Sequence, residues 1–221
     1  MDVSLRYMPS FATLFVTLNP GENIIAEAGA MASMSAHTRM RTRFNGGFFR
    51  AILRRVFGGE SLFLNEFYCA ESSEKPASLV LTQPTPGDVC AITLRGNTLC
   101  LQPGAFIACT SGIKLRLAWA GFASWFGGEG LFRMEVSGYG QVWMGGYGSI
   151  VAQDISHEIR IDTSHLVAYE PTLSLHIALA GGLFSSFFGG EGFVTRVKGQ
   201  GRLYVQSRSM DTLAHWTNGH I

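Results

Sequence analysis

Hydrophobic and polar residues alternate with a period of two through much of this 221-residue chain. Residues 113–119 place Ile, Leu, Leu and Trp at every second position with Lys and Arg between them, and residues 132–136 and 173–179 repeat the alternation. A period of two is typical of a β-strand with one buried face, and turns rich in Gly and Pro separate these short runs. The pattern therefore predicts an all-β fold of the sandwich or barrel class.

Helical periodicity is almost absent from the chain. No window of ordinary length places apolar residues on one face of a helix with a period of 3.6 residues. The one candidate is residues 48–57, which predict one or two turns at most.

One segment containing Gly-Gly-Glu occurs three times, at residues 57–63, 126–132 and 188–194. Two further landmarks recur in the same order around it. They are an apolar residue followed by Ala upstream (residues 25–26, 107–108 and 167–168) and a Gly-x-Gly segment downstream (residues 138–140 and 199–201). This order predicts three tandem β modules, at residues 1–91, 92–152 and 153–221. The first module carries insertions near residues 43–55 and at residues 71–76, and we interpret the second insertion as an exposed loop.

The composition limits the classes of function. Hydrophobic residues make up 47% of the chain and charged residues 15%, whereas about 25% charged residues is usual. Either the fold buries an unusual share of itself, or part of its surface meets another subunit. The formal net charge of +1 offers no electrostatic basis for binding nucleic acid.

The chemically reactive residues form no catalytic or metal-binding motif. The four cysteines (Cys69, Cys90, Cys100 and Cys109) include no C-x-x-C pair, and we interpret all four as buried small hydrophobes in a reducing compartment. The six histidines are scattered, and the chain has no Gly-x-Ser-x-Gly segment and no dinucleotide-binding fingerprint. We therefore predict a protein that is not an enzyme, with no catalytic residues, no metal ligands and no cofactor.

The apolar runs do not predict a membrane-spanning helix or a signal peptide. No stretch of about 18 apolar residues is free of charge, and no clear basic region precedes the apolar run at residues 11–18. We expect a cytoplasmic protein, with association at a membrane surface as an alternative.

The three repeated glutamates have two interpretations. Glu60, Glu129 and Glu191 would bind a cation if the modules brought them together near a pseudo-threefold axis. Alternatively, each carboxylate accepts hydrogen bonds from backbone N–H groups of its own glycine turn. We favour the second interpretation. It assigns a structural turn to Gly59, Glu60, Gly128, Glu129, Gly190 and Glu191.

An aromatic connection precedes each Gly-Gly-Glu segment, at residues 44–49, 119–126 and 181–188. Large apolar side chains in a connection need cover from a neighbouring subunit, a membrane surface, a partner protein or the core of the same module. The candidate interaction residues are Phe48, Phe49, Arg50, Arg54, Phe122, Trp125, Phe126, Phe184, Phe187 and Phe188. Arginines beside the first connection would favour anionic lipid.

Arg39, Arg41 and Arg43 alternate along one predicted strand. Side chains two residues apart on a strand share one face. We interpret this basic row as a solvent-exposed face, with a binding stripe as the alternative.

The chain resembles the altered-inheritance-of-mitochondria protein family along nearly its whole length. The matching stretches are residues 20–31, 58–63, 86–88, 104–108, 127–132, 138–140, 147–148, 162–168 and 189–192. The resemblance implies three β modules similar to the tryptophan RNA-binding attenuation protein, of a double-stranded β-helix type in a pseudo-threefold arrangement. It also implies a homotrimer, because similar proteins form rings, and it links the mitochondrial members to the organisation of the inner membrane.

The resemblance brings no catalytic residues, and RNA binding does not transfer either. The attenuation protein needs repeated basic contacts, whereas the modules of this chain share an acidic residue. The function we predict is a non-enzymatic oligomeric scaffold or interaction protein, a homo-oligomer with a trimer favoured. The alternatives are a peripheral membrane-surface protein that uses its aromatic loops, and a small-ligand or metal-binding protein with sites between modules.

Overall fold

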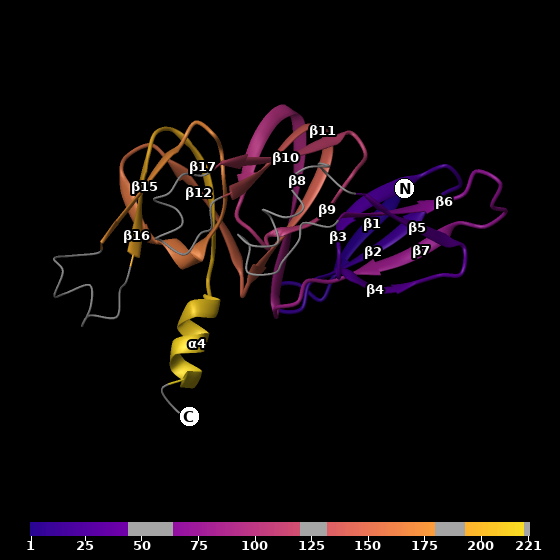
Figure 1. The fold of residues 1–221 in the computed structure, drawn as a ribbon, viewed down its shortest axis with the longest axis horizontal. Coiled ribbons are helices and arrows are strands. Elements are labelled where there is room, and N and C mark those ends of the chain that lie inside the picture. Colours follow the sequence, from indigo (N-terminus) through magenta and orange to yellow (C-terminus); the bar gives the residue numbers. More distant parts are fainter. Residues whose placement is uncertain (44–63, 120–131, 180–192, 219–221) are drawn as a thin grey trace. The chain divides into compact units, whose positions relative to one another are not determined.

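The computed structural model describes residues 1–43, 64–119, 132–179 and 193–218 (Figure 1). The strands in chain order are β1 (Asp2–Arg6), β2 (Thr13–Leu18), β3 (Asn23–Glu27), β4 (Met31–Met34), β5 (Thr38–Arg43), β6 (Leu64–Cys69), β7 (Ala77–Leu81), β8 (Gly87–Leu101), β9 (Phe106–Cys109), β10 (Ile113–Trp119), β11 (Phe132–Tyr147), β12 (Ile150–Ile155), β13 (Ile159–Asp162), β14 (Leu166–Tyr169), β15 (Ser174–Leu179), β16 (Phe193–Lys198) and β17 (Gly201–Gln206). A 3-10 turn, η1 (Thr163–His165), precedes β14. The predicted all-β class is confirmed.

The strands in the described part of the chain form three sheets. One has four strands in the order β1-β2-β7-β4, and another has three in the order β13-β16-β15. The largest sheet has ten strands, in the order β12-β17-β14-β8-β11-β9-β3-β6-β5, with β10 paired to β11. Its two end positions are therefore occupied by β12 and β5.

The chain forms two compact units that interleave along the sequence. Unit 1 contains Met1–Asn97, Phe106–Lys114 and Ser137–Gly145, and unit 2 contains the remaining segments. The long strands β8 and β11 each run through both units. The division into three sequence modules stays a prediction.

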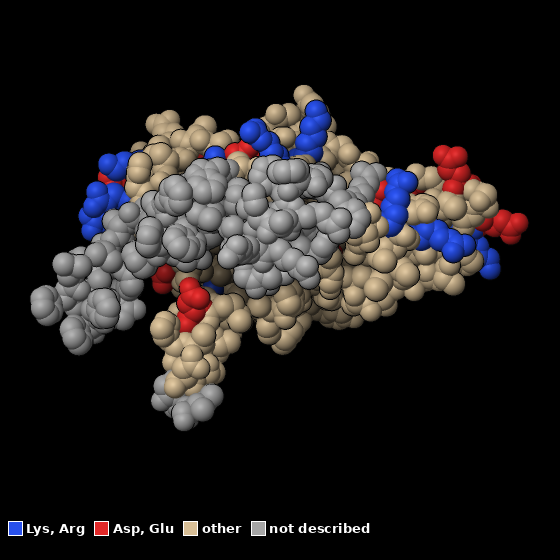
Figure 2. All heavy atoms as spheres, in the orientation of Figure 1, with Lys and Arg blue, Asp and Glu red and all other residues tan. Residues whose placement is uncertain are grey.

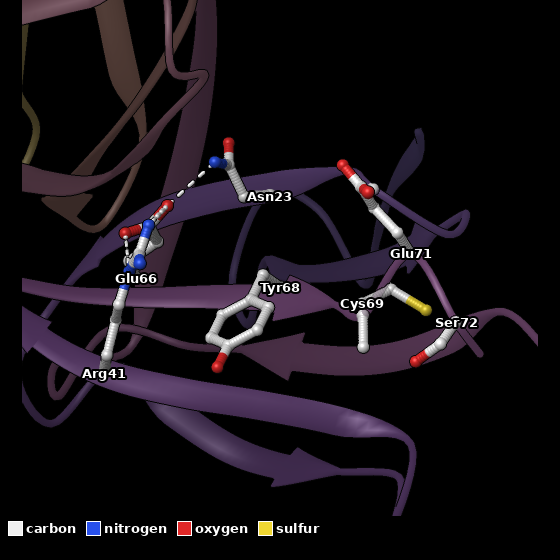
Figure 3. Close-up of a pocket in the computed structure, with 9 residues that line it drawn as sticks. Asn23, Arg41, Glu66, Tyr68, Cys69, Glu71 and Ser72 are labelled. Atoms are coloured by element: carbon white, nitrogen blue, oxygen red, sulfur yellow. Dashed lines mark hydrogen bonds and ion pairs between the residues drawn. The ribbon is translucent and has the colours of Figure 1, made fainter.

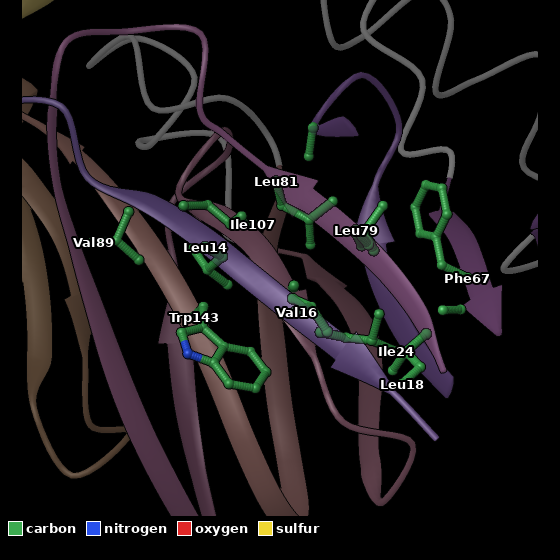
Figure 4. Close-up of a cluster of buried hydrophobic side chains, with 14 of the residues drawn as sticks. Leu14, Val16, Leu18, Ile24, Phe67, Leu79, Leu81, Val89, Ile107 and Trp143 are labelled. Atoms are coloured by element: carbon green, nitrogen blue, oxygen red, sulfur yellow. The ribbon is translucent and has the colours of Figure 1, made fainter. Parts of the chain in front are cut away.

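The core of unit 1 joins side chains from β2 and β7 of the four-stranded sheet with side chains from β3, β6, β9 and β11 of the ten-stranded sheet (Figure 4). Leu14, Val16 and Leu18 alternate on β2 and are buried, and on β7 Leu81 lies opposite Leu14. Trp143 of β11 joins the same cluster with 2% of its surface exposed. The two-residue period of the sequence thus becomes one apolar face.

Unit 2 has a smaller core cluster. It joins Cys100 of β8, Leu166 and Tyr169 of β14, Val197 of β16 and Leu203 of β17. Tyr169 lies opposite Cys100 in the pairing of β14 with β8. Each cluster therefore includes a buried cysteine, Cys69 in unit 1 and Cys100 in unit 2, beside branched side chains from neighbouring strands.

The two Gly-x-Gly segments have the same local structure in the two units. Gly138 and Gly199 have φ angles of +118° and +121°, which only glycine adopts readily. A Cβ atom at Gly138 would lie 2.4 Å from the carbonyl oxygen of Gly112, and one at Gly199 would lie 2.6 Å from that of Thr172. Both segments therefore need glycine for the same steric reason.

The helix α4 (Met210–Asn218) is a difference from the sequence prediction, which placed no helix there. Ser209 caps it, because the Ser209 Oγ accepts from the Thr212 backbone N–H at 3.1 Å. None of its residues is buried, so it lacks the covered apolar face that periodicity detects. A serine cap followed by Asp211 in the first turn was the available signal. The earlier helical candidate, residues 48–57, lies outside the described residues.

Candidate functional site: sheet edges and a polar pocket

The two end strands of the ten-stranded sheet are exposed on both faces. Residues 39–42 of β5 and residues 151–154 of β12 form two runs of four consecutive exposed positions. Met40 and Val151 are each 47% exposed. A strand that alternates between core and solvent would bury every second residue. These two strands instead leave apolar side chains and an unpaired backbone edge uncovered among the described residues.

The pairing of β5 with β6 places a charged side chain inside unit 1. Arg41 on β5 lies directly opposite Glu66 on β6, and β3 pairs with the other side of β6. Glu66 is 0% exposed. A buried carboxylate is costly unless hydrogen bonds and an opposite charge compensate it.

Arg41 and Asn23 both bind the Glu66 carboxylate. Arg41 donates from Nε to Oε2 at 2.5 Å and from Nη2 to Oε1 at 3.0 Å. Asn23 donates from Nδ2 to Oε1 at 2.8 Å. The Arg41 contact is bidentate, which fixes the plane of the guanidinium as well as its position. The hydrogen bonds to Glu66 raise the pKa of Arg41, so the guanidinium stays charged at neutral pH.

Arg41 also lies over an aromatic ring and keeps free donors. Its Cζ is 5.4 Å from the centroid of the Tyr68 ring, and its side chain remains 60% exposed. Its Nη1 has no hydrogen-bond partner among the described residues. The prediction of a solvent-exposed basic row is therefore incomplete, because Arg41 also binds a buried carboxylate.

A pocket of about 520 Å³ opens beside this group (Figure 3). Its polar lining comes from Asn23, Arg41, Glu66, Tyr68, Glu71 and Ser72. Figure 3 shows the Arg41–Glu66 pair at one end, Glu71 at the other end and Tyr68 between them. Sequence reasoning missed this pocket. The available signal was Glu66, an acidic residue in an apolar strand beside the row of arginines.

Unit 2 carries a related group of residues on β11 and β14. Arg133 donates to Glu135 Oε1 from Nη2 at 3.0 Å, and from Nη1 to the Tyr169 hydroxyl at 3.2 Å. Arg116 Nη1 lies 3.9 Å from Glu135 Oε2. The Glu135 side chain is 20% exposed, so water reaches this carboxylate.

The cysteines are free thiols, and three of the four are buried. Cys90 is half-buried, which corrects the prediction that all four are buried. Desolvation raises the pKa of Cys109 to about 12 and also raises the pKa values of Cys90 and Cys100. These three thiols are therefore protonated and weakly nucleophilic at neutral pH.

The interaction and turn residues predicted from the sequence all lie outside the described residues. They fall between β5 and β6, between β10 and β11, and between β15 and β16. They are Phe48, Phe49, Arg50, Arg54, Gly59, Glu60, Phe122, Trp125, Phe126, Gly128, Glu129, Phe184, Phe187, Phe188, Gly190 and Glu191. Their roles stay predictions.

The described part of the chain contains no group of three or more His, Cys, Asp or Glu side chains arranged to hold a metal ion. None of its helices has the length and apolar character needed to cross a membrane. On the face shown in Figure 2, charged side chains of the described residues are separated by broad uncharged areas, consistent with the low charged fraction.

Comparison with known proteins places the chain in a family. A model of the mitochondrial biogenesis AIM24 family matches residues 3–208. The chain belongs to the mitochondrial biogenesis AIM24 family.

Two streptococcal proteins are similar to this AIM24-family chain. An uncharacterized protein of Streptococcus pyogenes serotype M6 is 28% identical over 213 residues, which cover 92% of this chain and 84% of the relative. A crystal structure of a Streptococcus pyogenes protein matches with a TM-score of 0.79 at 26% identity, over 100% of this chain and 99% of the other. The all-β fold is thus shared with a solved structure along its whole length.

Proposed function

We propose that this protein is a non-enzymatic scaffold that assembles into a homotrimer through the two edges of its ten-stranded sheet. The observation that carries the proposal is the exposure of β5 and β12 on both faces. An uncovered edge is a template for pairing with another strand, and natural proteins usually cover or protect it. A second copy of the chain would supply the missing neighbour for each edge.

The charges on the two edges favour pairing β5 with β12 over pairing β5 with another β5. Strand β5 carries Arg39, Arg41 and Arg43, whereas β12 carries no basic residue, and its one acidic residue, Asp154, is paired with Arg202 of β17. Like charges on directly opposite positions destabilise a strand pair. Two basic β5 strands would therefore repel each other, while β12 would accept β5.

Pairing between two different edges is heterologous, and it has a consequence for assembly. Each copy offers one β5 and one β12, so every added copy leaves a new edge open until the assembly closes into a ring. A closed ring of three copies is the assembly that the family resemblance implies. We infer the trimer from these two considerations together.

The thiol chemistry supports a non-enzymatic role inside a reducing compartment. Three thiols have raised pKa values and lack the thiolate that a nucleophilic cysteine needs. All four cysteines are free rather than paired in disulfides, which is usual for cytoplasmic proteins. We propose a cytoplasmic location on this basis. Association with a membrane through the aromatic connections stays a prediction, because those residues lie outside the described part of the chain.

The mass of the particle in solution tests the assembly. Light scattering on a sizing column should give three times the 24.0 kDa chain mass at micromolar concentration. Val151→Lys would place a positive charge on β12 opposite the basic β5 edge, so we expect this variant to elute as a monomer. Thr17→Lys is the matched control, because Thr17 is exposed on β2, inside the four-stranded sheet.

Reversing the charge at one position of β5 tests the pairing of β5 with β12 more specifically. Arg39→Glu combined with Val151→Lys should restore part of the association, because the two new charges attract each other. A monomeric wild-type protein, or a trimer that Val151→Lys leaves intact, would refute assembly through these edges.

A further inference from the structure

The pocket in unit 1 contains a guanidinium group that is held ready to bind an anion. The bidentate contact with Glu66 fixes Nε and Nη2 of Arg41, and the Tyr68 ring lies under the guanidinium. The Nη1 edge has no partner among the described residues. A group that is already immobilised loses little conformational entropy when a ligand binds. This edge has the geometry that a carboxylate recognises.

The opposite end of the pocket contains a carboxylate. Glu71 is exposed and makes no hydrogen bond or ion pair with the described residues. Its side chain lies against the turn at Gly21, where a Cβ atom would be 3.5 Å from Glu71 Cγ. Figure 3 shows Glu71 at the end of the pocket remote from Arg41.

The charge balance of the pocket limits the class of ligand. Arg41 and Glu66 neutralise each other, so Glu71 is the one uncompensated charge in the lining. A simple anion would gain from Nη1 but would be repelled by Glu71. A simple cation would gain from Glu71 and leave Nη1 without a partner. A ligand with a carboxylate at one end and an ammonium group at the other satisfies both ends.

We propose that this pocket binds a small zwitterion of the amino-acid class, with its carboxylate on Arg41 and its ammonium group on Glu71. Asn23 and Tyr68 also line the pocket, and the Asn23 Oδ1 and the Tyr68 hydroxyl have no partners among the described residues, so both add hydrogen-bonding capacity. The volume of about 520 Å³ falls within the usual range for small-molecule sites. The proposal concerns unit 1 alone and does not depend on the trimer.

Calorimetric titration of the full chain with matched probes tests this proposal. The zwitterionic probes are the ω-amino acids from glycine to 6-aminohexanoate, which vary the separation of the two charges. Hexanoate and hexylamine each carry only one of the charges. At least one zwitterion should bind roughly tenfold more tightly than both single-charge probes, a difference of about 1.4 kcal/mol.

Two variants assign the two ends of the ligand. Glu71→Gln should weaken binding of the zwitterion roughly tenfold and leave hexanoate binding no weaker. Glu74→Gln is the matched control, because Glu74 is an exposed glutamate of the same loop outside the pocket lining. Arg41→Lys keeps the positive charge but loses the planar donors, so it should weaken both the zwitterion and hexanoate.

Three results would overturn the proposal. They are no binding of any probe at millimolar concentration, equal affinity for the zwitterions and the single-charge probes, and equal effects of Glu71→Gln and Glu74→Gln. A particle mass measured alongside each titration separates loss of the pocket from loss of the assembly.

Discussion

Glu66 in unit 1 and Glu135 in unit 2 occupy the same sequence offset, six residues after a Gly-Gly-Glu glutamate. Glu66 is 0% exposed and is bound by Arg41 from the neighbouring strand and by Asn23. Glu135 is 20% exposed and is bound by Arg133 from its own strand. At the same offset in the third copy stands Val197, which is 0% exposed.

The difference shows that the strand position is fixed while its chemistry varies. Each of these positions lies on the strand that follows a Gly-Gly-Glu segment. In unit 1, Arg41 and Asn23 from the neighbouring strands bind the carboxylate, which is fully buried and lines a pocket. In unit 2, Arg133 of the same strand binds the carboxylate, Arg116 of β10 lies 3.9 Å away, and water still reaches it. In the third copy, Val197 belongs to an apolar cluster. Function at this offset must therefore be assigned separately for each unit.

Truncation of the two cores should have the largest effect. Leu14→Ala in unit 1 and Leu203→Ala in unit 2 each remove a side chain that is 0% exposed, and each should lower the free energy of unfolding by about 2–5 kcal/mol. Because β8 and β11 run through both units, we expect one unfolding transition by chemical denaturation. Two separate transitions, with each variant shifting only one, would show that the units unfold independently.

Replacing the first glycine of either Gly-x-Gly segment should lower the stability of the fold by a similar amount, and this is the next largest effect. Gly138→Ala and Gly199→Ala force a positive φ and a close contact with a backbone oxygen, so each should cost about 1–3 kcal/mol. Gly104→Ala is the control. It shares a positive φ of +79° but has open space around the new Cβ, and it should cost about 1 kcal/mol. Equal losses of stability in all three variants would show that the close contact with a backbone oxygen contributes nothing.

Removing the charge of Glu66 and removing that of Glu135 should lower the stability of the fold by unequal amounts. Glu66→Gln disturbs a buried charge-assisted group and should cost about 1–3 kcal/mol. Glu135→Gln weakens a pair that water already reaches, and it should cost less than about 1 kcal/mol. Thermal and chemical denaturation of both variants measure the difference. A larger loss of stability in Glu135→Gln than in Glu66→Gln would contradict the claim that the buried carboxylate contributes more to stability than the partly exposed one.

Ionisation of the buried thiols should have the smallest effect on the stability of the fold. The effect should be absent at neutral pH and grow only at alkaline pH. Burial raises the pKa of Cys109 in unit 1 from its ordinary value near 9.0 to about 12. In unit 2, burial and the charge of Glu135 also raise the pKa of Cys100, whereas Arg133 and the Tyr169 hydrogen bond lower it. The unfolded thiol loses its proton first as pH rises. Stability should therefore be unaffected below about pH 9 and fall between about pH 9 and 12.

Single substitutions separate the two cysteines. Cys109→Ala should remove more of the alkaline loss than Cys100→Ala, as followed by denaturation at pH 7 to 10. Equal slopes in the two variants would mean that the two thiols are equally desolvated.

Sequence periodicity predicted the strands well because each buried face leaves a direct two-residue signature. At residues 132–136, where alternation predicted a strand, Met134 and Val136 of β11 are buried and the residues between them are partly exposed. The Gly-x-Gly landmarks were visible for a similar reason, since a positive φ restricts the residue type locally. These features depend on neighbours in the sequence.

Features that depend on distant residues were not predictable. The burial of Glu66 is set by Arg41 and Asn23, which lie 25 and 43 residues away. The helix α4 buries nothing and leaves no periodic signal. The end positions of β5 and β12 follow from the strand order of the whole sheet, which no local pattern encodes.

Hydrogen exchange at the sheet edges tests the proposed assembly most directly. Backbone amides of β5 (Thr38–Arg43) and β12 (Ile150–Ile155) should exchange slowly in the wild-type protein at micromolar concentration. The same amides should exchange quickly in Val151→Lys, while the edge strands β1 and β4 of the four-stranded sheet should exchange equally in both. Fast exchange of β5 and β12 in the wild-type protein at every concentration would contradict assembly through these edges.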